Sequence, residues 1–133
     1  MLNRRSHCPI AYALDTFGDR WTLLIVRDLM LKGKRRYVEF KDGGEGIASN
    51  ILVDRLTRLR EEGLVTSATD SLDGRGKIYS LTPKGLDLAP LMVEMILWSA
   101  KHDPDTLADR PFVRRAKRDR GGLLDEIAAA NRS

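Results

Sequence analysis

The sequence has few of the side chains on which small enzymes and metal proteins depend. Its 133 residues include one cysteine and two histidines, and His7 and His102 stand at opposite ends of the expected core. A single cysteine excludes an intrachain disulfide framework, and no metal-ligand spacing includes Cys8. Because catalysis needs several convergent polar groups, we expect no enzyme, no metal and no bound cofactor.

Long apolar runs are missing as well. No segment approaches the roughly 20 apolar residues that a membrane helix needs, and no signal-peptide stretch follows Arg4 and Arg5. We therefore expect a cytoplasmic protein. The apolar residues, 42% of the total, suffice for a core, and the net charge is +4. This mild excess of cations permits binding to a polyanion but does not establish it.

The first half of the sequence has helical periodicity. Residues 10–17 place apolar side chains at i, i+4 and i+7, and Asp19 fits the N-cap of a second helix that runs to about Gly33 and is apolar almost all round. A short apolar cluster at 37–40 precedes a glycine-rich loop. The next predicted helix, 49–62, has inward-facing leucines at helical spacing and Gly63 as its stop, the leucines being Leu52, Leu56 and Leu59.

The period then changes to that of a hairpin. Residues 64–69 and 77–82 are rich in β-branched side chains and flank a polar segment, 70–76. Thr82-Pro83 is a helix-start signal, and we expect one long helix from there to about His102 with a kink at Pro90.

Two regions are expected from this organisation. Residues 1–102 would form a DNA-binding domain with its dimerisation helices. Residues 103–133 would form a charged linker followed by a short amphipathic helix. The cationic run within that linker, residues 114–120, is either a second phosphate-binding strip or only solvated, and the sequence favours neither reading.

The order of elements, three helices followed by a hairpin, predicts a mainly α fold with a small β-hairpin wing, a winged helix-turn-helix. In this fold the helix before the hairpin enters the major groove, while the wing approaches phosphates. The short polar side chains of Ser49 and Asn50 are expected to read bases. The predicted phosphate-binding cations are Arg36, Arg55, Arg58, Arg75 and Lys77. Taken alone, the basic helix face would be interpreted as a solvated surface, and its place one element before a basic-tipped hairpin favours DNA contact instead.

Short motifs spread over residues 7–102 strongly resemble those of the HxlR-type winged-helix regulators: Cys8-Pro9, Gly18-Asp19-Arg20-Trp21-Thr22-Leu23-Leu24-Ile25, Tyr37-Val38-Glu39-Phe40, Arg55-Leu56, Glu62-Gly63-Leu64-Val65 and Tyr79-Ser80-Leu81-Thr82. These bacterial proteins are dimeric repressors or activators related to the MarR group. The resemblance implies a homodimer that binds double-stranded DNA at a palindromic operator, and repression is the preferred role. Some members sense oxidants or electrophiles through a cysteine at the position matching Cys8.

The sequence departs from the family pattern at three places. Ala48 replaces the serine that commonly caps the groove helix, so capping falls to Ser49 or to no side chain. The hairpin tip, Gly74-Arg75-Gly76, lacks the proline-rich form common in the family. The tail from about Asp103 also extends past the usual family core.

Three further expectations concern assembly and sensing. The helix predicted from Pro83 to His102 has surplus apolar side chains, at Leu91, Met92, Met95 and Trp98. They predict a dimer interface formed by this helix, the first helix and the terminal helix. Trp21 and Trp98 are core or interface residues, or they line a pocket for a small effector. Cys8 is either a buried thiol without chemistry or a redox sensor, since the field at a helix N-terminus favours the reactive thiolate. A winged helix that binds a protein instead of DNA is the alternative function.

Overall fold

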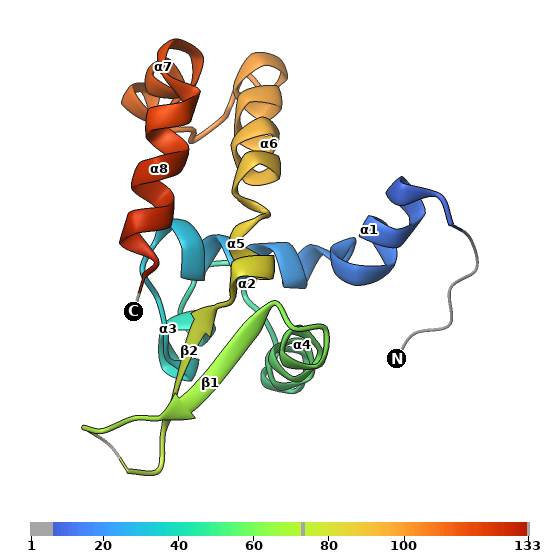
Figure 1. The fold of residues 1–133 in the computed structure, drawn as a ribbon, viewed down its shortest axis with the longest axis vertical. Helices are drawn as coiled ribbons and strands as arrows, with labels where there is room; N and C mark the ends of the chain where they lie inside the picture. The colour runs from blue at the N-terminus through green and yellow to red at the C-terminus, as the bar shows by residue number, and fades with distance from the viewer. Residues whose placement is uncertain (1–6, 73, 133) are drawn as a thin grey trace. The chain divides into compact units, whose positions relative to one another are not determined.

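The computed structural model describes residues 7–72 and 74–132. Contacts divide the chain into two compact units, Met1–Gly85 and Leu86–Ser133. The elements of the first unit are the helices α1 (Pro9–Phe17), α2 (Arg20–Leu31), α3 (Tyr37–Lys41) and α4 (Ser49–Glu61), the strands β1 (Val65–Thr69) and β2 (Lys77–Leu81), and the short helix α5 (Pro83–Leu86), which ends at the boundary (Figure 1). The predicted mainly α winged helix is confirmed.

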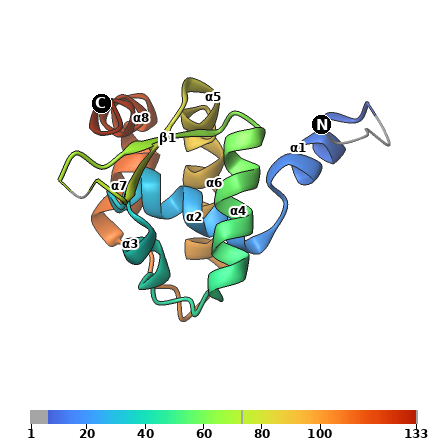
Figure 2. The same cartoon turned by 90° about the horizontal axis from the view of Figure 1, so that it is seen from below.

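Helix α2 is the centre of the first unit. It begins as predicted, because the Asp19 carboxylate accepts a hydrogen bond from the Thr22 amide at 3.1 Å and so caps the helix. Its core side chains, Ile25, Val26 and Leu29, are at most 3% exposed. Figure 2 shows α4 crossing α2. The short helix α3 precedes α4, and these two are the helices of the helix-turn-helix.

Helix α4 packs through the three predicted leucines, Leu52, Leu56 and Leu59, each at most 3% exposed. Its N-cap residue is Ala48 and no side chain makes a capping bond, so of the two alternatives, Ser49 or no side chain, the structure has the second. The helix ends where predicted because Gly63 has a φ of 75°, a left-handed conformation that glycine adopts without strain.

The wing is an antiparallel hairpin in which β1 and β2 pair from Val65 with Leu81 to Thr69 with Lys77. After β2 the chain passes close to Leu64, the residue that precedes β1. A Cβ atom at Gly85 would lie 2.2 Å from the Leu64 carbonyl oxygen, so this approach requires glycine.

The second unit consists of helices α6 (Ala89–His102), α7 (Arg110–Arg118) and α8 (Arg120–Ala130). The prediction of one kinked helix from Pro83 to His102 is wrong, since helical structure breaks between Leu86 and Ala89. Pro90 lies in the first turn of α6, where its missing N–H leaves no helical hydrogen bond unmade.

The segment predicted as a charged linker, 103–120, contains α7. The Asp109 carboxylate caps this helix by accepting from the Phe112 amide at 3.0 Å, and Pro111 follows in its first turn. Only Val113 and Ala116 are buried, a narrow apolar stripe that the surrounding charges concealed in the sequence. The predicted terminal helix is confirmed as α8, which buries Leu123 and Ile127. Among the described residues, no helix has both the length and the apolar character needed to cross a membrane.

Candidate nucleic-acid interface

The outer face of α4 carries the two predicted base-reading residues. Ser49 and Asn50 are exposed in its first turn, and their side chains make no hydrogen bond within the described part of the chain. Short polar groups in this position can reach base edges when the helix enters a major groove. The structure therefore leaves their donors and acceptors available to a ligand.

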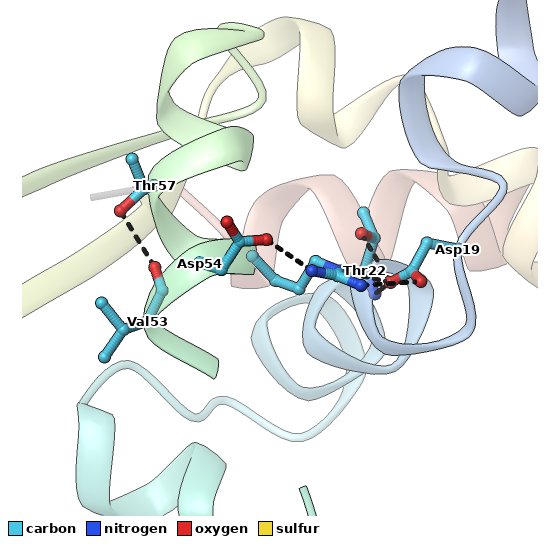
Figure 3. Close-up of polar contacts among 6 residues, drawn as sticks. Asp19, Thr22, Val53, Asp54 and Thr57 are labelled. Atoms are coloured by element: carbon cyan, nitrogen blue, oxygen red, sulfur yellow. Dashed lines mark hydrogen bonds and ion pairs between the residues drawn. The ribbon is translucent and has the colours of Figure 1, made fainter. Parts of the chain in front are cut away.

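Sequence reasoning missed two further residues of this face, Val53 and Thr57. Val53 is 54% exposed, and Thr57, one turn later, is also exposed. Both lie on the side of α4 turned away from Asp19 (Figure 3). The Thr57 hydroxyl donates to the Val53 carbonyl oxygen at 2.9 Å, so the apolar groups dominate this part of the face. The signal was an apolar residue, Val53, outside the spacing of the buried leucines, and such a side chain suits a thymine methyl group.

Arg55 was predicted to bind phosphate, but its guanidinium is engaged within the chain. Nε and Nη2 donate to the two carboxylate oxygens of Asp19 at 2.7 and 3.1 Å, and Nη1 contacts Asp54 (Figure 3). The Arg55 side chain is only 17% exposed. This hydrogen bond lowers the pKa of Asp19 to about 2 and raises the pKa of Arg55. Arg55 therefore holds α4 against the N-terminus of α2.

Arg36, also predicted to bind phosphate, is bound to the base of the wing. Its Nε lies 2.7 Å from the Oδ2 atom of Asp70, a residue that is 3% exposed. Asp70 closes the wing loop, because its Oδ1 accepts from the Leu72 amide at 2.9 Å and its own amide donates to the Gly76 carbonyl oxygen at 2.9 Å. The ion pair raises the pKa of Arg36. Arg36 thus anchors the wing to the start of α3.

Glu39 fixes the backbone that presents Arg36. Its Oε1 atom accepts from the amides of Arg35 and Arg36, each at 2.9 Å, and these bonds, that of Arg35 foremost, lower the pKa of Glu39. The Arg35 carbonyl oxygen in turn accepts from the Tyr79 amide of β2 at 2.9 Å. The N-terminus of α3 and the wing are therefore joined by both backbone and side-chain bonds.

The other three residues predicted to bind phosphate lie on the wing and on α4. Arg75 and Lys77 are exposed, at the wing tip and at the start of β2. Arg58 is partly buried in the second half of α4. Of the five predicted cations, the structure therefore places Arg36, Arg75 and Lys77 at the same wing.

The two tryptophans lie in different units. Trp21 lines a small hollow of about 10 Å³ between α2 and the loop after α3, room for about one water molecule. Trp98 is 67% exposed on α6, with its ring 5.0 Å from that of His102. The reading of Trp98 as a core residue is therefore wrong within the described chain.

Cys8 is exposed at the N-cap of α1. The alternative of a buried thiol is therefore wrong. Arg4 and Arg5, which precede Cys8 in the sequence and could lower the pKa of its thiol, fall outside the described residues. His7, which directly precedes Cys8, is described and exposed. Within the described chain, no cluster of His, Cys, Asp or Glu residues could hold a metal ion.

A helix crossing the central helix, an outward polar face on it and a hairpin wing define a winged helix-turn-helix transcription regulator. A family model described as HxlR-like helix-turn-helix matches residues 16–106. The chain belongs to this family, which confirms the resemblance drawn from its motifs.

Relatives and solved structures agree with this assignment. The HTH-type transcriptional regulator YvaP of Bacillus subtilis is 33% identical over 108 residues, covering 80% of this chain and 99% of the relative. A longer HTH-type regulator from Synechocystis, sll1512, is 30% identical over 66% of this chain and 64% of its own length. The crystal structure of PA1607, described as a transcription factor, superposes with a TM-score of 0.70 and 38% identity over 80% of this chain and 74% of its own. The redox regulator HypR in its oxidized form has a TM-score of 0.61 and 30% identity over 71% of this chain and 96% of its own.

Proposed function

We propose that this chain is a sequence-specific regulator that binds a palindromic operator as a homodimer and represses transcription. The observation that carries the proposal is one exposed face of α4 with small polar and apolar groups, formed by Ser49, Asn50, Val53 and Thr57. Base readout requires such groups, whereas non-specific phosphate binding requires only cations.

The wing supplies the phosphate contacts in this proposal. Arg75 and Lys77 are exposed on it, and the Arg36–Asp70 pair anchors its base. Changing both Arg75 and Lys77 to alanine should weaken binding to every duplex alike and reduce the slope of log affinity against log salt by about 2. Operator titrations at several salt concentrations measure both quantities. An unchanged affinity and slope would contradict the wing assignment.

The same titrations distinguish DNA binding from the alternative function, a winged helix that binds a protein. DNA binding through several cations weakens steeply between low and moderate salt. Wild-type protein that fails to enrich any duplex from a random library, yet is folded, would favour the protein-binding module.

The homodimer is supported by exposed apolar side chains in each unit. Ile10 and Leu14 of α1 are 70% and 61% exposed, and Met95 and Trp98 of α6 are 44% and 67% exposed. Met92, also expected at the interface, is instead 7% exposed within its own unit. The terminal helix likewise uses Leu123 and Ile127 inside the second unit, so we assign the interface to α1 and α6. A monomer in sedimentation at micromolar concentration would contradict this assignment.

Cys8 favours a second candidate function, a redox response. It is exposed at the start of α1, and the oxidized regulator HypR is among the similar structures. Diamide would take up two electrons and two protons as two thiols form a disulfide, either with the partner's Cys8 or with a small thiol; a peroxide would instead give a sulfenic acid. Operator affinity of wild type and Cys8→Ser should diverge only after oxidant. Identical responses would leave the tryptophans, Trp21 and Trp98, as the residues to test for effector binding.

A further inference from the structure

The cationic side chains of α7 form a stripe that nothing in the winged helix explains. The helix has five cations and no acidic residue among its nine residues. Four of the cations recur at i, i+4, i+7 and i+8 and are exposed, namely Arg110, Arg114, Lys117 and Arg118. Residues with this spacing share one helix face. We call these four residues the α7 stripe.

The stripe is segregated from the acidic residues of its unit. Arg115, the fifth cation of α7, is bonded to Glu126 at 3.0 Å and to Asp119 at 3.4 Å. Arg120, just after α7, is paired with Glu94. The four residues of the α7 stripe form no ion pair within the described chain. Asp119 and Glu126 are thus used by Arg115, and Asp109, next to Arg110, is used as the N-cap that accepts from the Phe112 amide.

The α7 stripe brings like charges together on one helix face. Lys117 and Arg118, in the last turn, suit the helix dipole, but Arg110 at the N-terminus does not, and like charges three and four residues apart repel one another. A solvated surface would gain from interspersed acidic residues, and this helix has none. The arrangement is therefore one that an external anion would relieve.

DNA phosphates fit the α7 stripe better than a membrane surface does. An interfacial helix needs an exposed apolar face opposite its cations, whereas Val113 and Ala116 of α7 are buried within the second unit. The stripe runs about 12 Å along the helix axis, a length over which duplex DNA presents several phosphate charges. We propose that the α7 stripe binds DNA phosphates as a second electrostatic contact, separate from α4 and the wing. This inference rests on the proposed DNA-binding function.

The test compares two triple variants with the same loss of charge. One changes Arg114, Lys117 and Arg118 to glutamine, and the control changes the exposed residues Lys32, Lys101 and Arg132 to glutamine. Duplexes enriched from a random library by the full-length wild type serve as the operator. Affinity is measured from low to moderate salt, and urea unfolding checks that each variant is folded.

The α7 variant should lower operator affinity and reduce the salt slope by about 2 to 3, while the control variant keeps a slope within about one of wild type. The stability of the α7 variant should change little, because the relief of like-charge repulsion is offset by the loss of Lys117 and Arg118 from the C-terminus of the helix dipole. If wild-type affinity depends steeply on salt and the α7 variant keeps the same salt slope, this inference alone is overturned. If the α7 variant keeps the salt slope of DNA binding but no longer binds anionic phospholipid vesicles, the inference is also overturned, in favour of a membrane. Wild type that enriches no duplex would instead overturn the proposed function.

Discussion

Arg36 and Arg55 of the winged helix and the cations of the α7 stripe have opposite surroundings. Arg36 and Arg55 are each bonded to a carboxylate, in Asp70 and Asp19, at 2.7 Å. The cations of the α7 stripe are exposed and have no acidic side chain within their helix. The sequence around them does not show which have a carboxylate partner, because the partners of Arg36 and Arg55 lie 34 and 36 residues away. The comparison teaches that a carboxylate partner, and not local charge density, separates an arginine that positions an element from one offered to a ligand.

The difference has a functional consequence. An arginine that spans two elements fixes their relative orientation, and the bidentate geometry of Arg55 on Asp19 constrains both distance and angle. Base readout depends on such orientation, since α4 must enter a groove at a defined angle. In the first unit the ion pairs thus prepare the site, and the exposed side chains of α4 and the wing contact the ligand.

Breaking the Asp19–Arg55 pair should have the largest effect on stability. Asp19→Ala removes both the α2 N-cap and the partner of Arg55, so we expect a loss of about 2 to 3 kcal/mol in the free energy of unfolding. Asp54→Ala removes only the more exposed partner and should change stability by at most about 0.5 kcal/mol. Urea unfolding of both variants measures the difference. Equal losses would mean that Asp19 does not hold α4.

Shortening the apolar part of the α4 face should have an intermediate effect on recognition. Val53→Ala should lose about 1 kcal/mol of discrimination at a thymine position while leaving the salt slope unchanged, because no charge is removed. Since Val53 is 54% exposed, stability should be little affected. Binding to operators substituted one base at a time checks this, and a changed salt slope would argue against base contact.

Releasing the wing should weaken binding without base preference. Arg36→Gln and Asp70→Asn should each reduce operator affinity several-fold, and the double variant should be no worse than either single variant, because the two residues act as a pair. Additive losses would indicate that Arg36 contacts phosphate independently of Asp70. Operator titrations of the wild type and the three variants give the double-mutant cycle that measures this coupling.

The contribution of the Asp19 carboxylate to stability should be lost only in strong acid. The folded pKa of about 2 lies below the ordinary value of 3.8, so the contribution is fully present above about pH 4 and disappears as the pH falls through about 2. Because the Asp19 side chain is 30% exposed, we expect its pH-dependent contribution to the free energy of unfolding to be about 1 kcal/mol. The stability difference between wild type and Asp19→Asn should therefore shrink between pH 4 and pH 2. A constant difference would contradict the pairing.

Local signals in the sequence predicted much of the fold. The Asp19 cap, the three leucines of α4 and the hairpin each follow from neighbouring residues. The interruption before α6 did not, since Pro90 fits a kink and a first turn equally well. Helix α7 was missed because its apolar stripe is only two buried residues wide.

The candidate site was only partly predictable. Ser49 and Asn50 could be placed from the position of their helix before the hairpin. The roles of Arg36 and Arg55 could not, because their partners lie 34 and 36 residues away and only the tertiary fold brings them together. Val53 was missed because an apolar residue in an amphipathic helix is ordinarily assigned to the core.

The central claim is that the exposed face of α4 reads bases, and selection of duplexes from a random library tests it most directly. Wild type should enrich a palindrome whose half-sites lie about one helical turn apart. Asn50→Ala should enrich the same palindrome with the preference relaxed at one position in each half-site, corresponding to about 1 to 3 kcal/mol. Identical motifs from the two proteins, or no motif from the wild type, would contradict the account.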